Sequence, residues 1–157
     1  MNNKLEKDMF NPLSADRVMK FAGCNRLLKY YDIHTLPSYK YLFDDNGKCL
    51  LLFELKNNSG HWVCLYFDKK KKIIYFFDSY GSFPDSQLGY IPKNFKKQSK
   101  QDYAYLSILL DKAIDDGIQI DYNNVKLQGP KTATCGRWCA LRLLMTYCSN
   151  DEFSDFF

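Results

Sequence analysis

The chain has 157 residues and a formal net charge of +4, a length that fits one domain. Hydrophobic residues make up 46% and charged residues 25%, which excludes a mostly disordered chain. Apolar runs such as 49–53 and 73–77 are far shorter than the ~20 residues that a membrane-spanning helix needs. No apolar stretch follows the charged N-terminal segment, so no secretory signal is expected. We therefore expect a soluble intracellular protein, with one domain over 1–157.

The first part of this domain, about 1–45, is expected to be helical. Ser14 is a good N-cap for a helix over 15–22, and Gly23 is a typical residue to end it. A second short helix is expected over 25–31. Residues 34–45 contain turn-forming residues and are expected to be irregular.

The sheet and the core are expected over about 46–150. Residues 49–55, 61–67 and 73–78 have strand character, and short turns join them. These runs are nearly continuous in apolar residues rather than alternating, which predicts a sheet covered on both faces.

The remaining chain is predicted to add helices around this sheet. We expect a loop with one helical turn over 82–100, an amphipathic helix over 102–116, short-strand material over 118–127 and a last helix from Cys135 to Tyr147. The order of elements predicts the α+β class, with one central, mostly antiparallel sheet flanked by helices. The sequence leaves open whether the C-terminal residues 151–157 pack on their own domain or enter the cleft of a neighbouring molecule.

The six cysteines are expected to be reduced, because the chain is long, aromatic-rich and without a signal. They are Cys24, Cys49, Cys64, Cys135, Cys139 and Cys148. The sequence has no C-x-x-C pair and only two histidines, so no metal site is expected.

Positive charge is concentrated in two lysine clusters. Their members are Lys69, Lys70, Lys71 and Lys72 in the first, and Lys93, Lys96, Lys97 and Lys100 in the second. One interpretation is a solvated turn and a solvated loop. The other is an electrostatic footprint for nucleic acid.

Three polar residues stand where the elements themselves do not require them. His61 begins an apolar strand, Asp78 ends the next strand, and Cys135 opens the last helix. In an antiparallel hairpin the first residue of one strand lies near the last residue of the other, so His61 and Asp78 should be neighbours. Such a carboxylate would fix the histidine tautomer and support the imidazolium form.

Cys135 and Gln128 complete this set. Unpaired N–H groups at a helix start stabilise a thiolate, and a nearby imidazolium would lower the thiol pKa further. The Gln128 amide, on the loop entering the helix, could donate to an oxyanion together with the Cys135 backbone N–H. Taken singly, these residues also fit a surface histidine, a turn-forming aspartate and an inert buried cysteine. Taken together, their order and placement favour acyl-transfer chemistry.

The residues around these positions resemble a known family. The blocks are Gly60-His61-Trp62, Phe77-Asp78-Ser79-Tyr80-Gly81, and Gln128 followed after six residues by Cys135-Gly136-Arg137-Trp138. They resemble the clan of adenain and the ubiquitin-like-protein proteases, whose order is His, Asp or Glu, Gln, Cys. The resemblance covers about 60–147.

This resemblance implies a papain-like fold in circularly permuted order and a cysteine protease. His61 would be the general base, Asp78 its orienting acid, Gln128 the oxyanion donor and Cys135 the nucleophile. Trp62 and Gly136 would line the substrate cleft, although Trp62 equally fits core packing.

The compact length resembles the viral maturation proteases of adenoviruses, virophages and Polinton-type elements. These relatives cut capsid or core precursor proteins, often after small residues such as Gly. We therefore expect a monomeric endopeptidase in the infected cell and the virion, with no membrane partner and no required cofactor. Adenain uses DNA and a viral peptide as cofactors. DNA stimulation stays open here, whereas no position matches adenain's peptide-linking cysteine.

Three other functions stay open at this point. The same residues would serve an isopeptidase that removes a ubiquitin-like modifier, or an acyltransferase. A DNA- or capsid-binding module without activity would use the lysine clusters instead.

Overall fold

A computed structural model describes residues 13–56, 59–129 and 133–157. The elements in chain order are α2 (Ala15–Ala22), β1 (Leu27–Lys29), the 3₁₀ helices η1 (Tyr30–Thr35) and η2 (Tyr39–Leu42), β2 (Lys48–Lys56), β3 (Ser59–Asp68), β4 (Ile73–Phe77), η3 (Ser86–Tyr90), α3 (Lys93–Gln98), α4 (Tyr105–Asp115), β5 (Gln119–Tyr122), α5 (Cys135–Leu144) and α6 (Asn150–Asp155). In the described part of the chain, no helix is long and apolar enough to cross a membrane.

A five-stranded sheet in the order β1-β2-β3-β4-β5 forms the centre of the molecule. The central ladders β2–β3 and β3–β4 are antiparallel, whereas the short edge strands β1 and β5 run parallel to their neighbours. The predicted α+β class and the central, mostly antiparallel sheet are confirmed.

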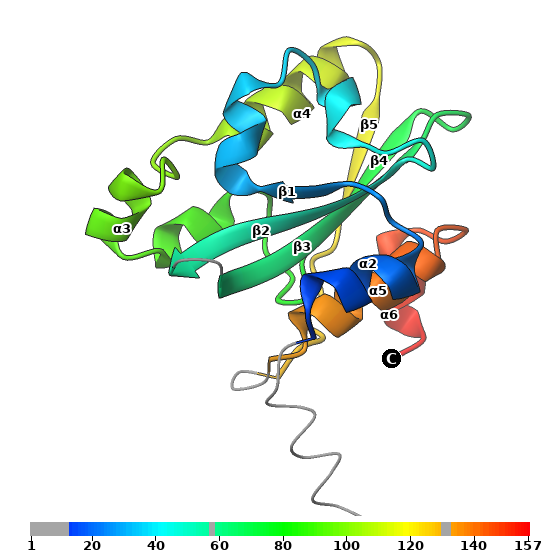
Figure 1. The fold of residues 1–157 in the computed structure, drawn as a ribbon. Coiled ribbons are helices and arrows are strands. Elements are labelled where there is room, and N and C mark those ends of the chain that lie inside the picture. Colours follow the sequence, from blue (N-terminus) through cyan, green and yellow to red (C-terminus); the bar gives the residue numbers. More distant parts are fainter. Residues whose placement is uncertain (1–12, 57–58, 130–132) are drawn as a thin grey trace, which may run out of the picture.

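Helices cover both faces of this sheet (Figure 1). On one face, η1, η2 and α4 pack against alternate strand residues such as Leu51 and Leu65. On the other face, α2, α5 and α6 pack against Leu50, Cys64 and Phe77. Neighbouring residues along a strand therefore enter two different cores, which explains the continuous apolar runs of the sequence.

The first predicted helix is confirmed and the second is wrong. Helix α2 begins after Ser14, whose hydroxyl accepts the Arg17 N–H at 3.4 Å, and ends at Gly23 with φ +61°. Residues 25–31 contain the edge strand β1, and the helical turn begins only at Tyr30. The Asp32 carboxylate accepts the Lys29 N–H at 2.8 Å and so fixes the start of η1 after the strand.

Two predicted helices differ in their bounds, and the loop expected over 82–100 contains η3 and α3. Helix α4 begins at Tyr105 rather than at 102. Helix α5 ends at Leu144 rather than at 147. The buried Arg142 guanidinium donates to the carbonyls of Met145 and Cys148 at 2.7 and 2.9 Å, which closes the C-terminal end of α5.

The C-terminal segment packs on its own domain. Ser149 and Glu152 form a capping box at the start of α6. Phe153 of α6 is fully buried, with its ring 5.3 Å from the Phe77 ring. Of the two alternatives left open by the sequence, the packed one describes this structure.

Candidate active site

His61 and Asp78 lie together at one end of the sheet. The β3–β4 ladder ends with the pair Cys64 and Phe77, and continuing its register sets Asp78 opposite Val63, two residues from His61. His61 and Asp78 therefore meet diagonally on one face of the sheet. His61 Nε2 lies 2.7 Å from Asp78 Oδ1, and both side chains are buried. The expectation that His61 and Asp78 are neighbours is confirmed.

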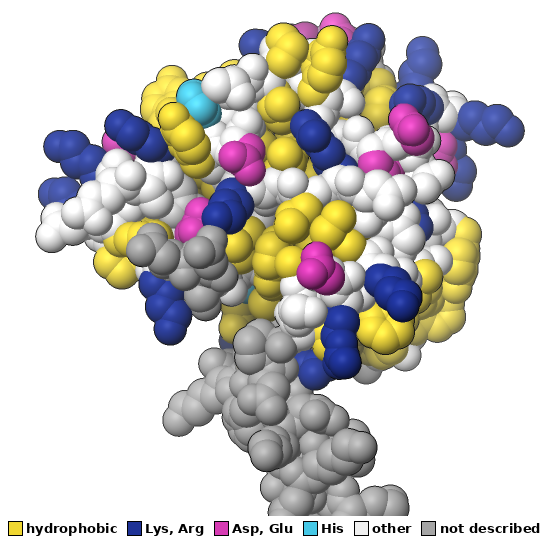
Figure 2. Space-filling view, in the orientation of Figure 1, with side chains coloured by type: hydrophobic (Ala, Val, Ile, Leu, Met, Phe, Trp, Pro, Cys, Tyr) yellow, Lys and Arg dark blue, Asp and Glu magenta, His cyan; other side chains and the backbone are white. Residues whose placement is uncertain are grey.

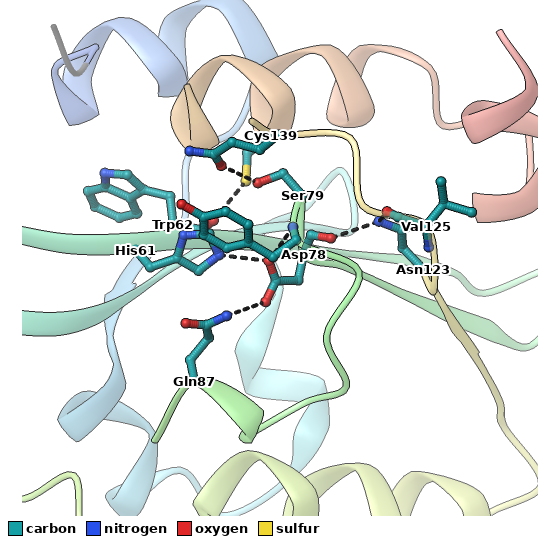
Figure 3. Close-up of polar contacts among 10 residues, drawn as sticks. His61, Trp62, Asp78, Ser79, Gln87, Asn123, Val125 and Cys139 are labelled. Atoms are coloured by element: carbon teal, nitrogen blue, oxygen red, sulfur yellow. Dashed lines mark hydrogen bonds and ion pairs between the residues drawn. The ribbon is translucent and has the colours of Figure 1, made fainter. Parts of the chain in front are cut away.

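Several donors hold the fully buried Asp78 carboxylate in place (Figure 3). Oδ1 accepts the Tyr80 backbone N–H at 2.9 Å in addition to the imidazole, and Oδ2 accepts Gln87 Nε2 at 3.0 Å. The Asp78 carbonyl accepts Asn123 Nδ2 at 2.7 Å. These hydrogen bonds fix the orientation of the carboxylate beside the imidazole.

Cys135 is the first residue of α5, and its thiol interacts with the His61 imidazole. Because His61 Nε2 is engaged by the carboxylate, Nδ1 is the ring nitrogen that can serve the sulfur. Burial acts to raise the pKa of the Cys135 thiol, but the His61 hydrogen bond and charge and the Trp62 and Gly136 backbone groups outweigh it, so the pKa is lowered.

The pKa of His61 moves in the opposite direction. Burial alone would lower this pKa, but the hydrogen bonds and negative charges of Asp78 and Cys135 raise it to about 9. A lowered thiol pKa beside a raised imidazole pKa favours a thiolate–imidazolium pair. Such a pair combines a nucleophile with a proton donor.

The other described thiols whose pKa is shifted move upward. Burial raises the pKa of Cys24 to about 11, and burial also raises the pKa of Cys49, Cys139 and Cys148. All six cysteines are free, as expected for reduced thiols. Among the described thiols with a shifted pKa, Cys135 is thus set apart as the reactive one.

Gln128 is fixed on the loop before α5. Its backbone N–H donates to the Ser79 carbonyl at 3.0 Å, and its Oε1 accepts the Ser79 hydroxyl at 2.6 Å. Because Oε1 accepts the Ser79 hydroxyl, the orientation of the Gln128 amide is fixed, and Nε2 is its donor end. Gln128 and Cys135 line the same cavity, so the amide is well placed to donate to an oxygen bound beside the sulfur.

The cavity has a volume of about 840 Å³ and is bordered by His61, Cys135 and Gln128. Trp62 lines this cavity and also packs against the α5-side core, so both interpretations of this residue apply. Gly136 lines it too, and a Cβ atom at this position would lie 3.0 Å from Val18 Cγ2. Close packing of α5 on α2 thus requires a small residue after Cys135.

The two lysine clusters are not brought together. Lys69, Lys70, Lys71 and Lys72 form the turn after β3, whereas the second cluster lies on and just after α3. Figure 1 shows α3 near the end of the sheet opposite this turn. Figure 2 shows basic side chains at both of these places, separated by the body of the molecule. Within the residues that the structure describes, no three His, Cys, Asp or Glu side chains are arranged to hold a metal ion.

Four residues of the site were not assigned from the sequence. Gln87 and Tyr80 contact the Asp78 carboxylate, Asn123 holds the Asp78 carbonyl, and Ser79 orients Gln128. The Tyr80 ring also stacks on the His61 ring, with centroids 4.8 Å apart. Ser79 and Tyr80 belong to the same sequence block as Asp78, and this proximity could have marked them as site residues. Gln87 and Asn123 lie in segments without a motif, so the sequence offered no signal for them.

The chain is similar to two known proteins. Uncharacterized protein V9 of the Sputnik virophage is 46% identical to this chain over 112 residues, which are 70% of this chain and 62% of that protein. The solved structure of the C-terminal Ulp1 protease domain in complex with Smt3, the yeast ortholog of SUMO, aligns with a TM-score of 0.45 and 16% identity, over 87% of this chain and 66% of that domain. The chain thus spans less than two thirds of the length of both proteins.

The family comparison covers most of the sheet and the helix α5, which begins with Cys135. Residues 51–153, about two thirds of the chain, match the family described as adenovirus endoprotease. This interval contains His61, Asp78, Gln128 and Cys135. The chain belongs to the adenovirus endoprotease family.

Proposed function

We propose that this chain is a cysteine endopeptidase with Cys135 as its nucleophile. The observation that carries the proposal is the buried His61–Asp78 pair, joined at 2.7 Å, in a cavity that Cys135 also lines. The lowered pKa of the Cys135 thiol supports the same assignment. Membership of the adenovirus endoprotease family makes a peptide bond the expected target.

In the first half of the reaction, the Cys135 thiolate attacks the carbonyl carbon of the scissile bond. The carbonyl oxygen becomes an oxyanion, which the Cys135 backbone N–H and the Gln128 amide stabilise. As the tetrahedral intermediate collapses, the imidazolium of His61 gives its proton to the leaving amine. The carbon–nitrogen bond breaks, and a thioester to Cys135 remains.

In the second half, water replaces the amine. Neutral His61 removes a proton from this water as the oxygen attacks the thioester carbon, and the same two donors hold the new oxyanion. Collapse breaks the carbon–sulfur bond and releases the carboxylic acid. Cys135 returns to the thiolate and His61 to the imidazolium, with Asp78 ionised throughout.

The substrates in this proposal are viral capsid or core precursor proteins, cut after small residues such as Gly in the infected cell or the virion. The 46% identity to a virophage protein and the family membership support a viral substrate. A monomer is sufficient for the proposed reaction, because one chain supplies all of the named side chains.

The test is co-expression of the chain with capsid proteins, followed by N-terminal sequencing of the fragments. Cys135→Ala should abolish the fragments. Cys139→Ala, which alters a second buried cysteine one turn further along α5, should leave them, since the raised pKa of that thiol makes it unreactive. Fragments that persist undiminished in Cys135→Ala would overturn the proposal. Cleavage confined to modifier conjugates, or acetyl transfer from acetyl-CoA, would replace it with isopeptidase or acyltransferase activity.

We also propose that DNA stimulates the enzyme through the lysine clusters, a proposal supported by the eight lysines of these clusters. Stimulation should fall as salt is raised, because released counterions drive such binding. Charge reversal at Lys70 and Lys71 should weaken stimulation without changing basal cleavage. Stimulation that is insensitive to salt and to this change would contradict the proposal. Tight DNA binding by a chain that cleaves nothing and whose Cys135 is unreactive would instead favour a binding module.

A further inference from the structure

We propose that Gln87 is a positioning residue that holds the Asp78 carboxylate in the orientation in which it serves His61. The inference rests on the proposed function, because it assigns a task within the same site. Gln87 has no direct contact with the sulfur in this assignment and acts through Asp78 alone.

The two oxygens of the Asp78 carboxylate accept hydrogen bonds from different donors. Oδ1 receives the imidazole at 2.7 Å and the Tyr80 N–H at 2.9 Å, whereas Oδ2 receives the side-chain amide of Gln87 at 3.0 Å. Asp78 is fully buried, and Gln87 is buried as well. Without this amide, Oδ2 would lose a donor in a place closed to water, which destabilises the ionised and correctly rotated carboxylate.

The position of Gln87 is fixed in turn by Asp85, two residues earlier. Asp85 adopts a left-handed backbone conformation, with φ +67°, directly before η3. Its Oδ1 accepts the Tyr30 hydroxyl at 2.6 Å, and its Oδ2 accepts the Ser107 N–H and hydroxyl at 2.8 and 2.6 Å. η3 is thereby tied to η1 and to the first turn of α4, so the Gln87 side chain starts from an anchored backbone.

A neutral amide suits this position better than a charged donor. It neutralises none of the negative charge of Asp78, so that charge stays available to support the imidazolium of His61. Among the described residues, the titratable groups near this carboxylate and imidazole include Cys135, Tyr80 and Cys139. Lys126 lines the same cavity, with its Nζ 5.7 Å from the centre of the Tyr80 ring. Cys135 and His61 are the pair expected to respond if the Asp78 carboxylate turns.

The pH dependence of Cys135 alkylation by iodoacetamide tests this inference without any substrate. In the wild-type protein the rate should show two inflections, one for thiol ionisation and one for loss of the imidazolium proton. Gln87→Met keeps the length of the side chain and removes the donor. We expect the lower inflection to rise and the upper inflection to fall. In a separate cleavage assay, kcat should drop about 10- to 100-fold, the range for a hydrogen bond to a charged group.

Gln87→Glu supplies a signature that a structural defect would not produce. A protonated glutamic acid can donate to Asp78, but an ionised one repels it, so the activity of this variant relative to wild type should fall as pH rises. Gln101→Met is the matched control, since Gln101 is equally buried but bonds to Ser99 and to the backbone of Glu54. It should lower the melting temperature and leave both inflections in place.

The inference is overturned if folded Gln87→Met retains both wild-type inflections, or if its inflections move no more than those of Gln101→Met. Failure of the proposed function looks different. In that case the alkylation profiles respond to Gln87 as described, but the wild-type chain cuts no protein.

Discussion

The charge state of two side chains sets the working pH of the proposed enzyme. The Cys135 pKa lies below its ordinary value of 9.0, and the pKa of His61 is raised to about 9. Nucleophilic attack needs the thiolate, and departure of the amine needs the imidazolium. The cleavage rate should therefore rise as the thiol ionises, stay high around neutral pH and fall as pH passes about 9.

Asp78→Asn tests the cause of this alkaline limit. The asparagine amide keeps the size of the side chain but removes the negative charge that helps to hold the proton on His61. The descending limb of kcat/KM against pH should move to lower pH, and the maximum rate should fall. An unchanged descending limb would show that Asp78 does not set the His61 pKa.

The proposed stabilisation of the oxyanion by the Gln128 amide can be tested by substitution. Gln128→Ala removes one of the two proposed donors, and loss of one such donor typically lowers kcat about 10²- to 10³-fold. Ser79→Ala should lower kcat less, because it removes only the hydroxyl that orients the Gln128 amide at 2.6 Å. Kinetics with melting curves check both variants. A Gln128→Ala enzyme that keeps wild-type kcat would remove Gln128 from the mechanism.

At the scale of the element, the start of β3 depends on a residue without a side chain. Gly60 directly precedes His61, and a Cβ atom there would lie 1.9 Å from the Phe53 carbonyl oxygen of β2. Gly60→Ala must push the two strands apart, which should lower the free energy of unfolding by about 1–3 kcal/mol and reduce activity by moving His61. Gly89→Ala is the control, since the added carbon would meet no described atom within 4 Å beyond its own stretch of backbone.

Denaturant unfolding and the cleavage rate together check this pair. Gly89→Ala should change the free energy of unfolding by no more than about 0.5 kcal/mol. Equal effects of the two substitutions would mean that the strand spacing at Gly60 is not what places His61.

The elements also show why part of the site was predictable from the sequence. His61 and Asp78 belong to one hairpin with a short turn, so local strand patterns were enough to bring them together. The strand β1 has three residues, too few to show a period, and it is held by pairing with Leu50, Leu51 and Leu52 far along the chain. The contact of Gln87 with Asp78 arises only once η3 is anchored through Asp85, and no local pattern encodes that anchor.

At the scale of the whole molecule, the C-terminal helix supports the cavity from behind. The buried ring of Phe153 on α6 lies 5.3 Å from the ring of Phe77, which directly precedes Asp78. It also lies 6.4 Å from the ring of Trp138, which is three residues after Cys135. One aromatic side chain therefore contacts both the strand that presents the carboxylate and the helix that presents the sulfur.

Phe153→Ala should lower the free energy of unfolding by about 3–5 kcal/mol, the usual cost of emptying a large aromatic site in a core. Phe156→Ala, three residues along and 62% exposed, should change it by no more than about 0.5 kcal/mol. Because the lost contacts reach both Phe77 and Trp138, the Phe153 variant should also cleave more slowly at temperatures where it is fully folded. Denaturant unfolding and kcat measured at such a temperature check the two effects separately. Reduced stability with an unchanged kcat would show that α6 holds the fold together but does not set the spacing of Cys135 and Asp78.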